Sequence, residues 1–201
     1  MDCLEDPIQE ITEKGVRLAS GEVELDMLIF ATGYDGLTGA LLNFDVIGRD
    51  GQNLKDKWAD GAKSMLGLGM AGFPNFFTTV GPNGPSALAN IIHINENDVD
   101  WIARAITYMD DNGLCAMEPT EEAENAWMDH VRELASRSLV SKAKTWYVGA
   151  NIEGKPQGLT IYTGGFAKYV EACEAAAKDN FAAYRFAPRR GATAEPAKKT
   201  A

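Results

Sequence analysis

The chain has 201 residues, a net charge of −10, 45% hydrophobic residues and 24% charged residues. This composition is typical of a soluble globular domain, and the length is enough to bury one sizeable core. The acidic balance argues against a nucleic-acid partner, which would require a basic face. The longest apolar run, Met27 to Ala31, is far too short to cross a bilayer, so we expect no membrane partner.

Three cysteines, Cys3, Cys115 and Cys173, lie far apart and form no C-x-x-C pattern. They are typical of free thiols in a reducing cytoplasm, and the acidic N-terminus has no signal-peptide pattern, so we expect a cytoplasmic location. His93 and His130 fall on helix patterns without a paired ligand. We therefore expect no metal site.

The first part of the chain predicts strands. Residues 8–31 contain short alternating segments with turn signals at residues 13–15 and 19–21. The continuously apolar run Met27 to Ala31 predicts a central strand that is covered on both faces and ends at Thr32 and Gly33. The aromatic and β-branched run Phe76 to Val80 predicts a second central strand, followed by a rigid loop at residues 81–85.

Helical spacing dominates the second half. A long helix is expected over residues 86–112, with Ser86 as N-cap and Gly113 just beyond its end. A second helix starts near Thr120, and a last helix covers residues 166–183. The expected buried stripe of the long helix consists of Leu88, Ile91, Ile92, Val99, Ile102, Ala105, Ile106 and Met109.

Two glycine-rich segments invite a nucleotide-binding interpretation. Residues 67–72 match G-x-G-x-x-G, but a strand rather than a helix is expected after them, so we reject them as a dinucleotide fingerprint. Residues 81–86 open a helix whose N-terminus has the polarity to face an anion, but on sequence spacing alone a structural strand-to-helix connection is the favoured interpretation.

Trp146 lies in a polar, glycine-bearing loop over residues 145–163 and falls on no core stripe. An indole in such a place suits contact with a sugar or ring, and folding onto the surface is the alternative. The carboxylates Glu121 and Glu122 are assigned to the start of the second helix, because acidic side chains stabilise helix N-termini.

These segments, taken in order, resemble the Baeyer–Villiger monooxygenases, and among them the cyclohexanone and phenylacetone monooxygenase branch. The two strongest pieces are Phe30-Ala-Thr-Gly-Tyr-Asp35 and Trp146 to Pro156. The other matching segments are residues 37–41, 54–58, 71–75, 81–90, 99–102 and 162–165. The resemblance covers roughly the C-terminal two-fifths of a family member.

The resemblance implies an α/β fold, namely the C-terminal part of a flavoprotein with two dinucleotide-binding domains, with incomplete Rossmann-like sheets and long helices. Residues 1–38 would end the NADP-binding domain, residues 39–186 would form the C-terminal part of the FAD-binding domain, and residues 187–201 are expected to be a disordered tail. The implied cofactors are FAD and NADPH. The implied reaction inserts one oxygen atom of O₂ beside a ketone carbonyl to give an ester or lactone.

The resemblance also implies site residues. Trp146 matches a mobile-loop tryptophan that contacts the ribose side of the nicotinamide cofactor, and Asn151 offers amide hydrogen bonds in the same loop. Thr32 and Gly33 match a strand end at the junction of the two nucleotide domains. The segment that lines the substrate pocket beside the flavin is matched by Ser86, Ala87, Leu88 and Ile91, of which Ile91 also borders the cofactor.

The family's catalytic arginine and both glycine fingerprints would lie upstream of this sequence, so no catalytic residue is assigned here. The expected partner is the N-terminal part of the same enzyme, and the isolated chain is expected to be inactive. Two alternatives stay open. One is a stand-alone acidic α/β binding module without catalysis, and the other is a fragment of a related flavoprotein that oxygenates nitrogen or sulfur.

Overall fold

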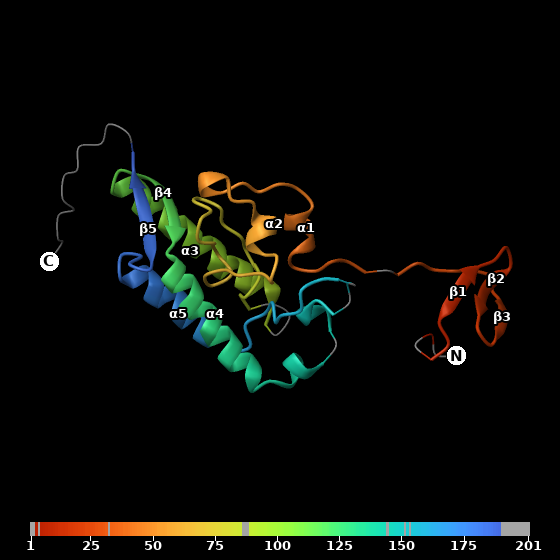
Figure 1. The fold of residues 1–201 in the computed structure, drawn as a ribbon. Helices are drawn as coiled ribbons and strands as arrows, with labels where there is room; N and C mark the ends of the chain where they lie inside the picture. Colours follow the sequence, from red (N-terminus) through yellow and green to blue (C-terminus); the bar gives the residue numbers. More distant parts are fainter. Residues whose placement is uncertain are drawn as a thin grey trace. The chain divides into compact units, whose positions relative to one another are not determined.

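The computed structural model describes residues 3, 5–31, 33–85, 89–143, 145–150, 152 and 154–189 (Figure 1). The chain divides into two compact units, Met1–Tyr34 and Asp35–Ala201. This division lies four residues before the predicted domain boundary at residue 38. The assignment of either unit to a nucleotide-binding domain stays a prediction, and the predicted tail beyond Arg189 lies outside the described residues.

The first unit is a three-stranded antiparallel sheet of β1 (Ile8–Ile11), β2 (Gly15–Leu18) and β3 (Gly21–Glu24). The β1–β2 turn is closed by the Thr12 hydroxyl, which accepts a hydrogen bond from the Gly15 N–H at 3.1 Å. Val16 and Leu18 on the central strand are buried. The predicted short strands and both tight turns of this part are confirmed.

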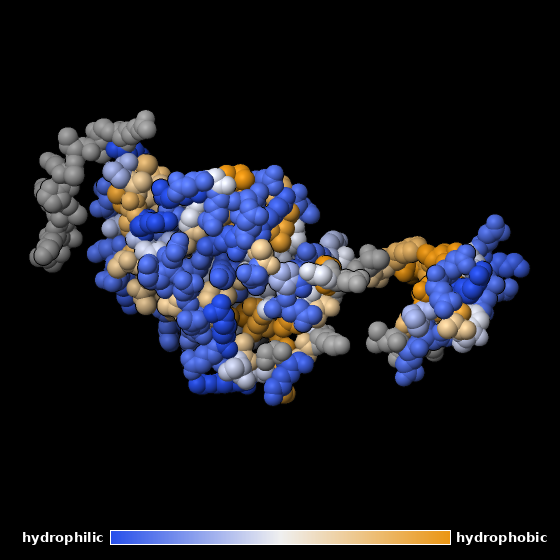
Figure 2. Space-filling model, viewed as in Figure 1, coloured by the Kyte–Doolittle hydropathy of each residue, from blue (hydrophilic) through white to orange (hydrophobic). Residues whose placement is uncertain are grey.

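The predicted central strand over residues 27–31 is wrong. This segment carries no strand, and Met27, Ile29 and Phe30 are exposed by 75%, 77% and 69%. Figure 2 shows orange, hydrophobic surface along this part of the chain. A strand that is apolar on both faces needs a neighbour along each edge and a layer over each face. Within the described residues, β1, β2 and β3 pair only with one another, so nothing covers this apolar run.

The core of the second unit lies among three helices and a two-stranded sheet. The helices are α3 (Ile91–Asp111), α4 (Glu121–Ser136) and α5 (Phe166–Lys178), and the sheet pairs β4 (Leu114–Pro119) with β5 (Tyr184–Pro188). The buried residues of this core are Leu66, Leu68, Trp101, Ala105, Met109, Met117, Trp127, Val131, Tyr162, Tyr169, Cys173, Phe181 and Tyr184.

Short elements precede these helices. They are α1 (Gly39–Leu42), η1 (Arg49–Gly51) and α2 (Leu54–Lys57), and a second small core gathers around them. Its buried members are Leu54, Trp58, Met70 and Phe73. Residues 67–72 form turns with no helix after them, as expected from the rejection of their G-x-G-x-x-G match.

The start of the long helix differs from the prediction. Helix α3 begins at Ile91, where the Asn90 side chain accepts a hydrogen bond from the Ile92 N–H, rather than at Ser86, which lies outside the described residues. Its end agrees, since Gly113 has a left-handed φ of 64° just beyond it. Helix α4 starts as predicted, with Thr120 accepting from the Ala123 N–H at 3.2 Å.

The hydrophobic spacing predicts a single stripe, but helix α3 carries apolar residues on two faces, one buried and one exposed. Its core face carries Trp101, Ala105 and Met109, all buried. Ile92 and Val99 from the predicted stripe are instead exposed by 69% and 54%, and the other exposed members are Ile91 and Ile106. A helix with apolar residues around most of its circumference is typical of a buried helix.

The small sheet was missed, and the strand predicted over residues 76–80 is wrong. Only an isolated bridge between Gly69 and Phe77 forms there, and Val80 has a left-handed φ of 49°. The last helix ends at Lys178, because Asn180 and Phe181 adopt left-handed φ values, and the chain then enters β5. Strand β4 lacks β-branched residues, so its sequence gave little strand signal.

Candidate functional site

Two segments singled out in the sequence lie against each other in the second unit. The turn over residues 35–39 meets the loop over residues 145–160. Lys155 Nζ forms an ion pair with Asp35 Oδ1, and the Cε3–Cζ3 edge of the Trp146 ring lies against Gly36. A Cβ atom added at Gly36 would lie 2.8 Å from the nearest ring carbon of Trp146. A side chain at position 36 would therefore displace the indole.

The turn needs a second glycine for a different reason. The Asp35 side chain folds over Gly39, where an added Cβ would lie 2.5 Å from the Asp35 Cβ. The Asp35 carbonyl also accepts a hydrogen bond from the Gly39 N–H at 3.2 Å. Gly39 therefore makes room for the carboxylate that pairs with Lys155, and helix α1 begins at this residue.

The loop is organised by bonds between its own arms. Its first arm contains the short helix η3 (Trp146–Val148), which ends at Gly149 with a left-handed φ of 75°. The Gly158 N–H donates to the Val148 carbonyl at 3.2 Å. The Tyr147 carbonyl accepts from both the N–H and the hydroxyl of Thr160, at 3.0 and 2.9 Å. The loop is thus a folded hairpin-like unit that carries Trp146 near one end.

Trp146 differs from the other three tryptophans of the chain. Their indole N–H groups donate to backbone carbonyls, Trp58 to Lys63, Trp101 to Cys173 and Trp127 to Asn83, and all three are buried. Trp146 is 41% exposed, and among the described residues no acceptor is paired with its N–H. Among the described residues its ring packs on Tyr147, with centroids 4.0 Å apart and planes tilted by 33°, and its edge meets Gly36. This arrangement leaves ring surface and a donor that a ligand could contact.

A cavity of about 450 Å³ lies beside this loop. Its lining includes the apolar side chains of Trp58, Met128 and Val131 and the cationic side chains of Lys63 and Arg132. Its size is in the range of small-molecule sites, which are typically ~300–1,000 Å³. The Thr38 hydroxyl beside it is buried and has no hydrogen-bond partner among the residues that the structure describes.

The loop over residues 81–85 is rigidly anchored. All of its residues are buried, and Asn83 has a left-handed φ of 66°. The Asn83 N–H donates to the Thr160 carbonyl at 2.7 Å, and the Asn83 carbonyl accepts from Trp127 Nε1 at 3.1 Å. The Tyr162 N–H donates to the Gly84 carbonyl at 2.8 Å. The residues that follow this loop therefore start from a fixed point.

Asp98 on α3 supports the entry to that loop. Its buried carboxylate accepts hydrogen bonds from the Val80 N–H at 2.9 Å and the Tyr169 hydroxyl at 2.7 Å. Burial raises the pKa of Asp98 above its usual range, although these hydrogen bonds oppose the shift. Val80 is a β-branched residue with a left-handed φ, so Asp98 stabilises a strained backbone position.

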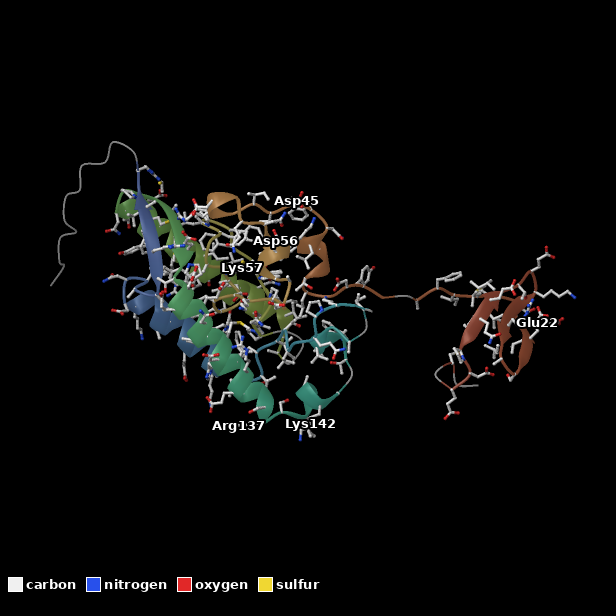
Figure 3. All side chains as sticks on the ribbon, in the orientation of Figure 1. Glu22, Asp45, Asp56, Lys57, Arg137 and Lys142 are labelled. Carbon is white, nitrogen blue, oxygen red and sulfur yellow. The ribbon has the colours of Figure 1, made fainter. Side chains whose placement is uncertain are left out.

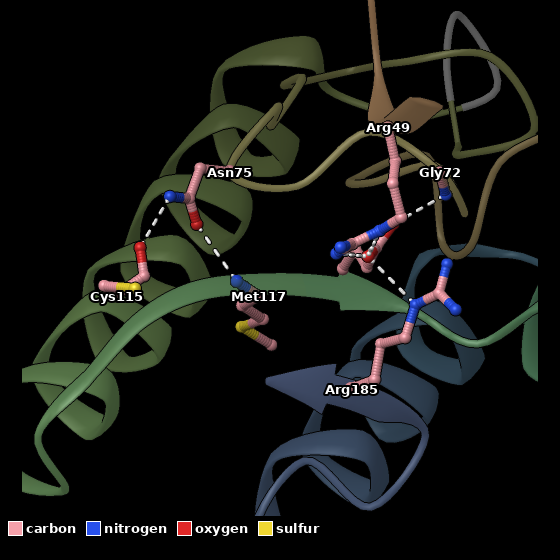
Figure 4. Close-up of polar contacts among 7 residues, drawn as sticks. Arg49, Gly72, Asn75, Cys115, Met117 and Arg185 are labelled. Carbon is pink, nitrogen blue, oxygen red and sulfur yellow. Dashed lines mark hydrogen bonds and ion pairs between the residues drawn. The ribbon is translucent and has the colours of Figure 1, made fainter. Parts of the chain in front are cut away.

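Two buried glutamates escaped the sequence analysis. Glu118 on β4 is 1% exposed and accepts from Arg49 Nε at 2.9 Å, from Arg185 Nε at 2.9 Å and from the Gly72 N–H at 2.7 Å (Figure 4). Burial alone would raise the pKa of Glu118, but the hydrogen bonds from Arg185, Arg49 and Gly72 outweigh it and lower the pKa.

Glu124 on α4 accepts a hydrogen bond from the backbone of Ala71, the residue before Gly72, and is also paired with a cationic side chain. Its carboxylate accepts from the Ala71 N–H at 3.0 Å and pairs with Lys57 Nζ at 2.7 Å. Nearby, the Asn75 side chain bonds to the Cys115 carbonyl and the Met117 N–H along the edge of β4 (Figure 4). These contacts fasten residues 49–75 to strand β4 and helix α4, which together we call the β4–α4 face. Their role is structural. The only sequence signal was the matching segment at residues 71–75.

No family model matches the chain. It is 44% identical over 176 residues to acetone monooxygenase (methyl acetate-forming) of Gordonia sp. (strain TY-5), which is 86% of this chain and 33% of that protein. It is 41% identical over 90% of its length to a Baeyer–Villiger monooxygenase of Pseudooceanicola batsensis, covering 33% of it. The chain is a homologue of the Baeyer–Villiger monooxygenases. It spans about one third of the length of the curated relatives that it matches.

Three further comparisons bear on this relationship. The closed crystal structure of cyclohexanone monooxygenase superposes with a TM-score of 0.89 at 38% identity, over 94% of this chain and 35% of that one. The structure of OTEMO in complex with FAD and NADP gives 0.86 at 38% identity, over 93% of this chain and 34% of that one. The predicted flavoprotein α/β fold is thereby confirmed. A phenazine N-monooxygenase of Lysobacter antibioticus is 39% identical over 82% of the chain and 30% of its own length.

The site residues predicted from the likeness to Baeyer–Villiger monooxygenases are partly visible. Trp146 lies at the turn over residues 35–39, Gly33 has a left-handed φ of 72° shortly before that turn, and Ile91 is the half-exposed first residue of α3. The others lie outside the described residues: Thr32, Ser86, Ala87, Leu88 and Asn151. In the described part of the chain, none of the helices has the length and apolar character needed to cross a bilayer.

Proposed function

We propose that this chain is a part of an FAD- and NADPH-dependent Baeyer–Villiger monooxygenase, which inserts one oxygen atom of O₂ beside a ketone carbonyl to give an ester or lactone. The observation that carries the proposal is the match to cyclohexanone monooxygenase, with a TM-score of 0.89 over 94% of this chain. Bound flavin would supply the activated oxygen in such an enzyme. The residues of this chain would position the cofactors and shape the ketone pocket.

The nicotinamide cofactor is assigned to Trp146 and its loop. The half-exposed indole has an open face and an N–H without an acceptor among the described residues, which suits a ribose hydroxyl and a ring. Asn151 in the same loop would add amide hydrogen bonds. Thr32 and Gly33 would border the cofactor from residues 25–34, which we call the joining segment because they connect β3 to the turn over residues 35–39. A folded loop over the cofactor would also exclude water from the reacting atoms.

The ketone pocket is assigned to Ser86, Ala87, Leu88 and Ile91. They lie between the anchored loop over residues 81–85 and the first turn of α3. A fixed preceding loop would hold these side chains at a constant distance from the flavin, which is what discrimination between similar ketones requires. Ile91 would then border both the flavin and the ketone.

The partner that we propose is the remaining part of the same enzyme. Residues 1–38 would complete its NADP-binding domain and residues 39–186 its FAD-binding domain. Ile92 and Val99 on α3, and Met27 and Phe30 in the joining segment, are exposed apolar side chains that the remainder would cover. The isolated chain would then be inactive, and its cytoplasmic location stays a prediction.

A second candidate is oxygenation of nitrogen, because a phenazine N-monooxygenase is 39% identical over 82% of this chain. The two reactions share the flavin chemistry and differ in the substrate that receives the oxygen. The stand-alone binding module is the less favoured alternative, because it would leave the apolar side chains of α3 uncovered.

A chimera tests the proposal. The matched third of cyclohexanone monooxygenase is replaced by this chain, and bound FAD, NADPH consumption, lactone formed and peroxide released are measured with cyclohexanone and with phenazine. We expect yellow protein that forms lactone from the ketone. Trp146→Ala should weaken NADPH binding and increase the peroxide released per NADPH several-fold, and Lys142→Met serves as the control.

The outcomes are distinct. Oxygenation of phenazine but not of the ketone would favour the second candidate. A folded, flavin-bound chimera that forms neither product would refute both. If the Trp146→Ala chimera binds NADPH as tightly as the parent chimera and releases the same amount of peroxide per NADPH, Trp146 does not contact the cofactor. The proposed monooxygenase activity would be unaffected by that result. The isolated chain should bind no stoichiometric FAD, which absorbance after dialysis checks.

A further inference from the structure

The ion pair between Asp35 and Lys155 is well shielded, although less than the pair of Lys57 and Glu124, whose side chains are 11% and 3% exposed. The Lys155 side chain is 14% exposed and the Asp35 side chain 34%, whereas Arg137 and Glu133 in an ordinary surface pair are 72% and 61% exposed. Exposed pairs contribute little, because water screens them and both side chains lose conformational freedom. A shielded pair is screened less and restricts the geometry of its partners more strongly.

Both partners are held in place by neighbouring glycines. The Asp35 side chain lies on Gly39, where no other residue type leaves room for it. On the other side, the aliphatic stem of Lys155 packs on Gly149, with its Cδ and Cε at 3.4 and 3.6 Å from the position of an added Cβ. Gly149 ends η3, and its N–H donates to the Trp146 carbonyl at 3.1 Å. Lys155 therefore reaches across the base of the helix that carries Trp146.

The second contact involves the residue next to Asp35. The edge of the Trp146 ring occupies the space where a side chain of Gly36 would project. Two adjacent residues of the turn are therefore contacted by the two arms of the loop, Asp35 by the Lys155 ammonium group and Gly36 by the indole. Other bonds of the loop, from Gly158 and Thr160 to Val148 and Tyr147, join its arms to each other, and the Asn83 N–H ties the Thr160 carbonyl in the second arm to the loop over residues 81–85. They would keep the loop folded but would not fasten η3 to the turn.

We propose that Asp35 and Lys155 form a latch that fixes the Trp146 loop to the turn over residues 35–39 and sets the orientation of the indole. Both are positioning residues, since they act through Trp146. Asp35 is also the first residue of the second unit, directly after the joining segment. If Trp146 contacts the nicotinamide cofactor, a point that rests on the proposed function, the latch prepares the loop for that contact.

The test needs neither cofactor nor turnover, so its outcome is independent of the proposed function. Trp146 is 41% exposed while the other tryptophans are buried, so acrylamide quenching of fluorescence reports chiefly on Trp146. Each variant is measured beside the same variant carrying Trp146→Phe, and the difference isolates the Trp146 signal. The variants are Asp35→Asn, Lys155→Met, the double variant and Lys155→Arg, with Lys142→Met as an exposed lysine control (Figure 3).

We expect Asp35→Asn and Lys155→Met each to raise the Trp146 quenching constant about two-fold, as the indole leaves Gly36 and its partly covered face opens to solvent. The double variant should add nothing, because both single changes break the same contact. Lys155→Arg should keep the quenching of the parent chain, and Lys142→Met should not change it. Circular dichroism and the urea midpoint show whether each variant is folded.

An unchanged quenching constant in folded Lys155→Met, or single effects that add in the double variant, would overturn the latch. If Lys155→Met fails to fold, Asp35→Asn decides alone, because it removes the charge while keeping the shape that packs on Gly39. If neither folds, the pair is a general stability contact rather than a latch, and that result also rejects the proposal.

Discussion

The β4–α4 face and the Trp146 loop are held by different numbers of contacts. On the β4–α4 face, Glu118 and Glu124 are nearly inaccessible, and each bonds a backbone N–H together with one or two cationic side chains. The Trp146 loop meets the turn over residues 35–39 through one ion pair and one ring edge. The first arrangement is redundant, whereas the second depends on single contacts.

From this difference we expect the β4–α4 face to act as a scaffold and the contact between the Trp146 loop and the turn to open locally. Regions with many buried contacts open only when most of the domain unfolds, and regions with few contacts open locally at low cost. The scaffold carries the anchored loop over residues 81–85, while the loop carries an indole with an open face. A binding site that admits and then encloses a ligand requires both kinds of region.

Glu118→Ala should give the largest effect. It removes the acceptor shared by Arg49, Arg185 and the Gly72 N–H, so we expect a loss of about 2–3 kcal/mol in the free energy of unfolding, moderated because both arginines are half exposed. Urea unfolding followed by circular dichroism measures it. The control is Glu133→Ala, which breaks an exposed pair and should cost no more than about 0.5 kcal/mol. If both variants lost the same free energy of unfolding, the buried carboxylate of Glu118 would be no more important for stability than an exposed surface carboxylate.

Trp127→Phe tests the anchor of the loop over residues 81–85. The ring volume is largely kept, but the Asn83 carbonyl loses its indole donor, which should cost about 1–2 kcal/mol. Hydrogen exchange should become faster at Asn83 and Tyr162, whose N–H groups bond within the same contact region. Protection that stays unchanged at both amides would show that the backbone bonds alone anchor the loop.

The buried carboxylates should give opposite pH dependences of about 1 kcal/mol or less. Glu118 has a lowered folded pKa, so its stabilisation is present above its ordinary value of 4.5 and is lost as pH falls through the folded pKa. Asp98 has a raised folded pKa, so its contribution is present below its ordinary value of 3.8 and is lost as pH rises through the folded pKa.

Urea unfolding between pH 3 and 6 should therefore show two trends. The deficit of Glu118→Gln relative to the parent chain should shrink as pH falls. The stability of Asp98→Asn relative to the parent chain should rise as pH increases. Parallel curves for either variant would show that the corresponding carboxyl has the same pKa in the folded and unfolded chains.

Gly36→Ala should have the smallest effect on stability, within about 0.5 kcal/mol, because the clash with Trp146 is offset by the lower entropy of the unfolded chain. It should nevertheless raise the quenching of Trp146 clearly, since the added methyl group takes the place of the ring. Gly158→Ala is the matched control, because a Cβ at position 158 meets nothing within 4 Å. Quenching that rises equally in both variants would indicate general loosening of the loop.

The sequence by itself determined the local features that one segment can encode. The turns between β1, β2 and β3 follow from glycine positions, and Thr120 and Gly113 mark helix ends because capping and left-handed backbone depend on single residues. The likeness to Baeyer–Villiger monooxygenases was also readable, because short motifs such as residues 30–35 and 146–156 occur in a fixed order.

The tertiary structure decided everything that depends on distant partners. Strand β4 exists because β5 pairs with it, and their residues Met117 and Phe186 are far apart in sequence. Glu118 is a structural residue because Arg49, Gly72 and Arg185 converge on it, which no spacing along the chain encodes. The apolar run at residues 27–31 is exposed for the converse reason. The hydrophobic pattern of a segment predicts that it should be covered, but its neighbours in space determine whether it is.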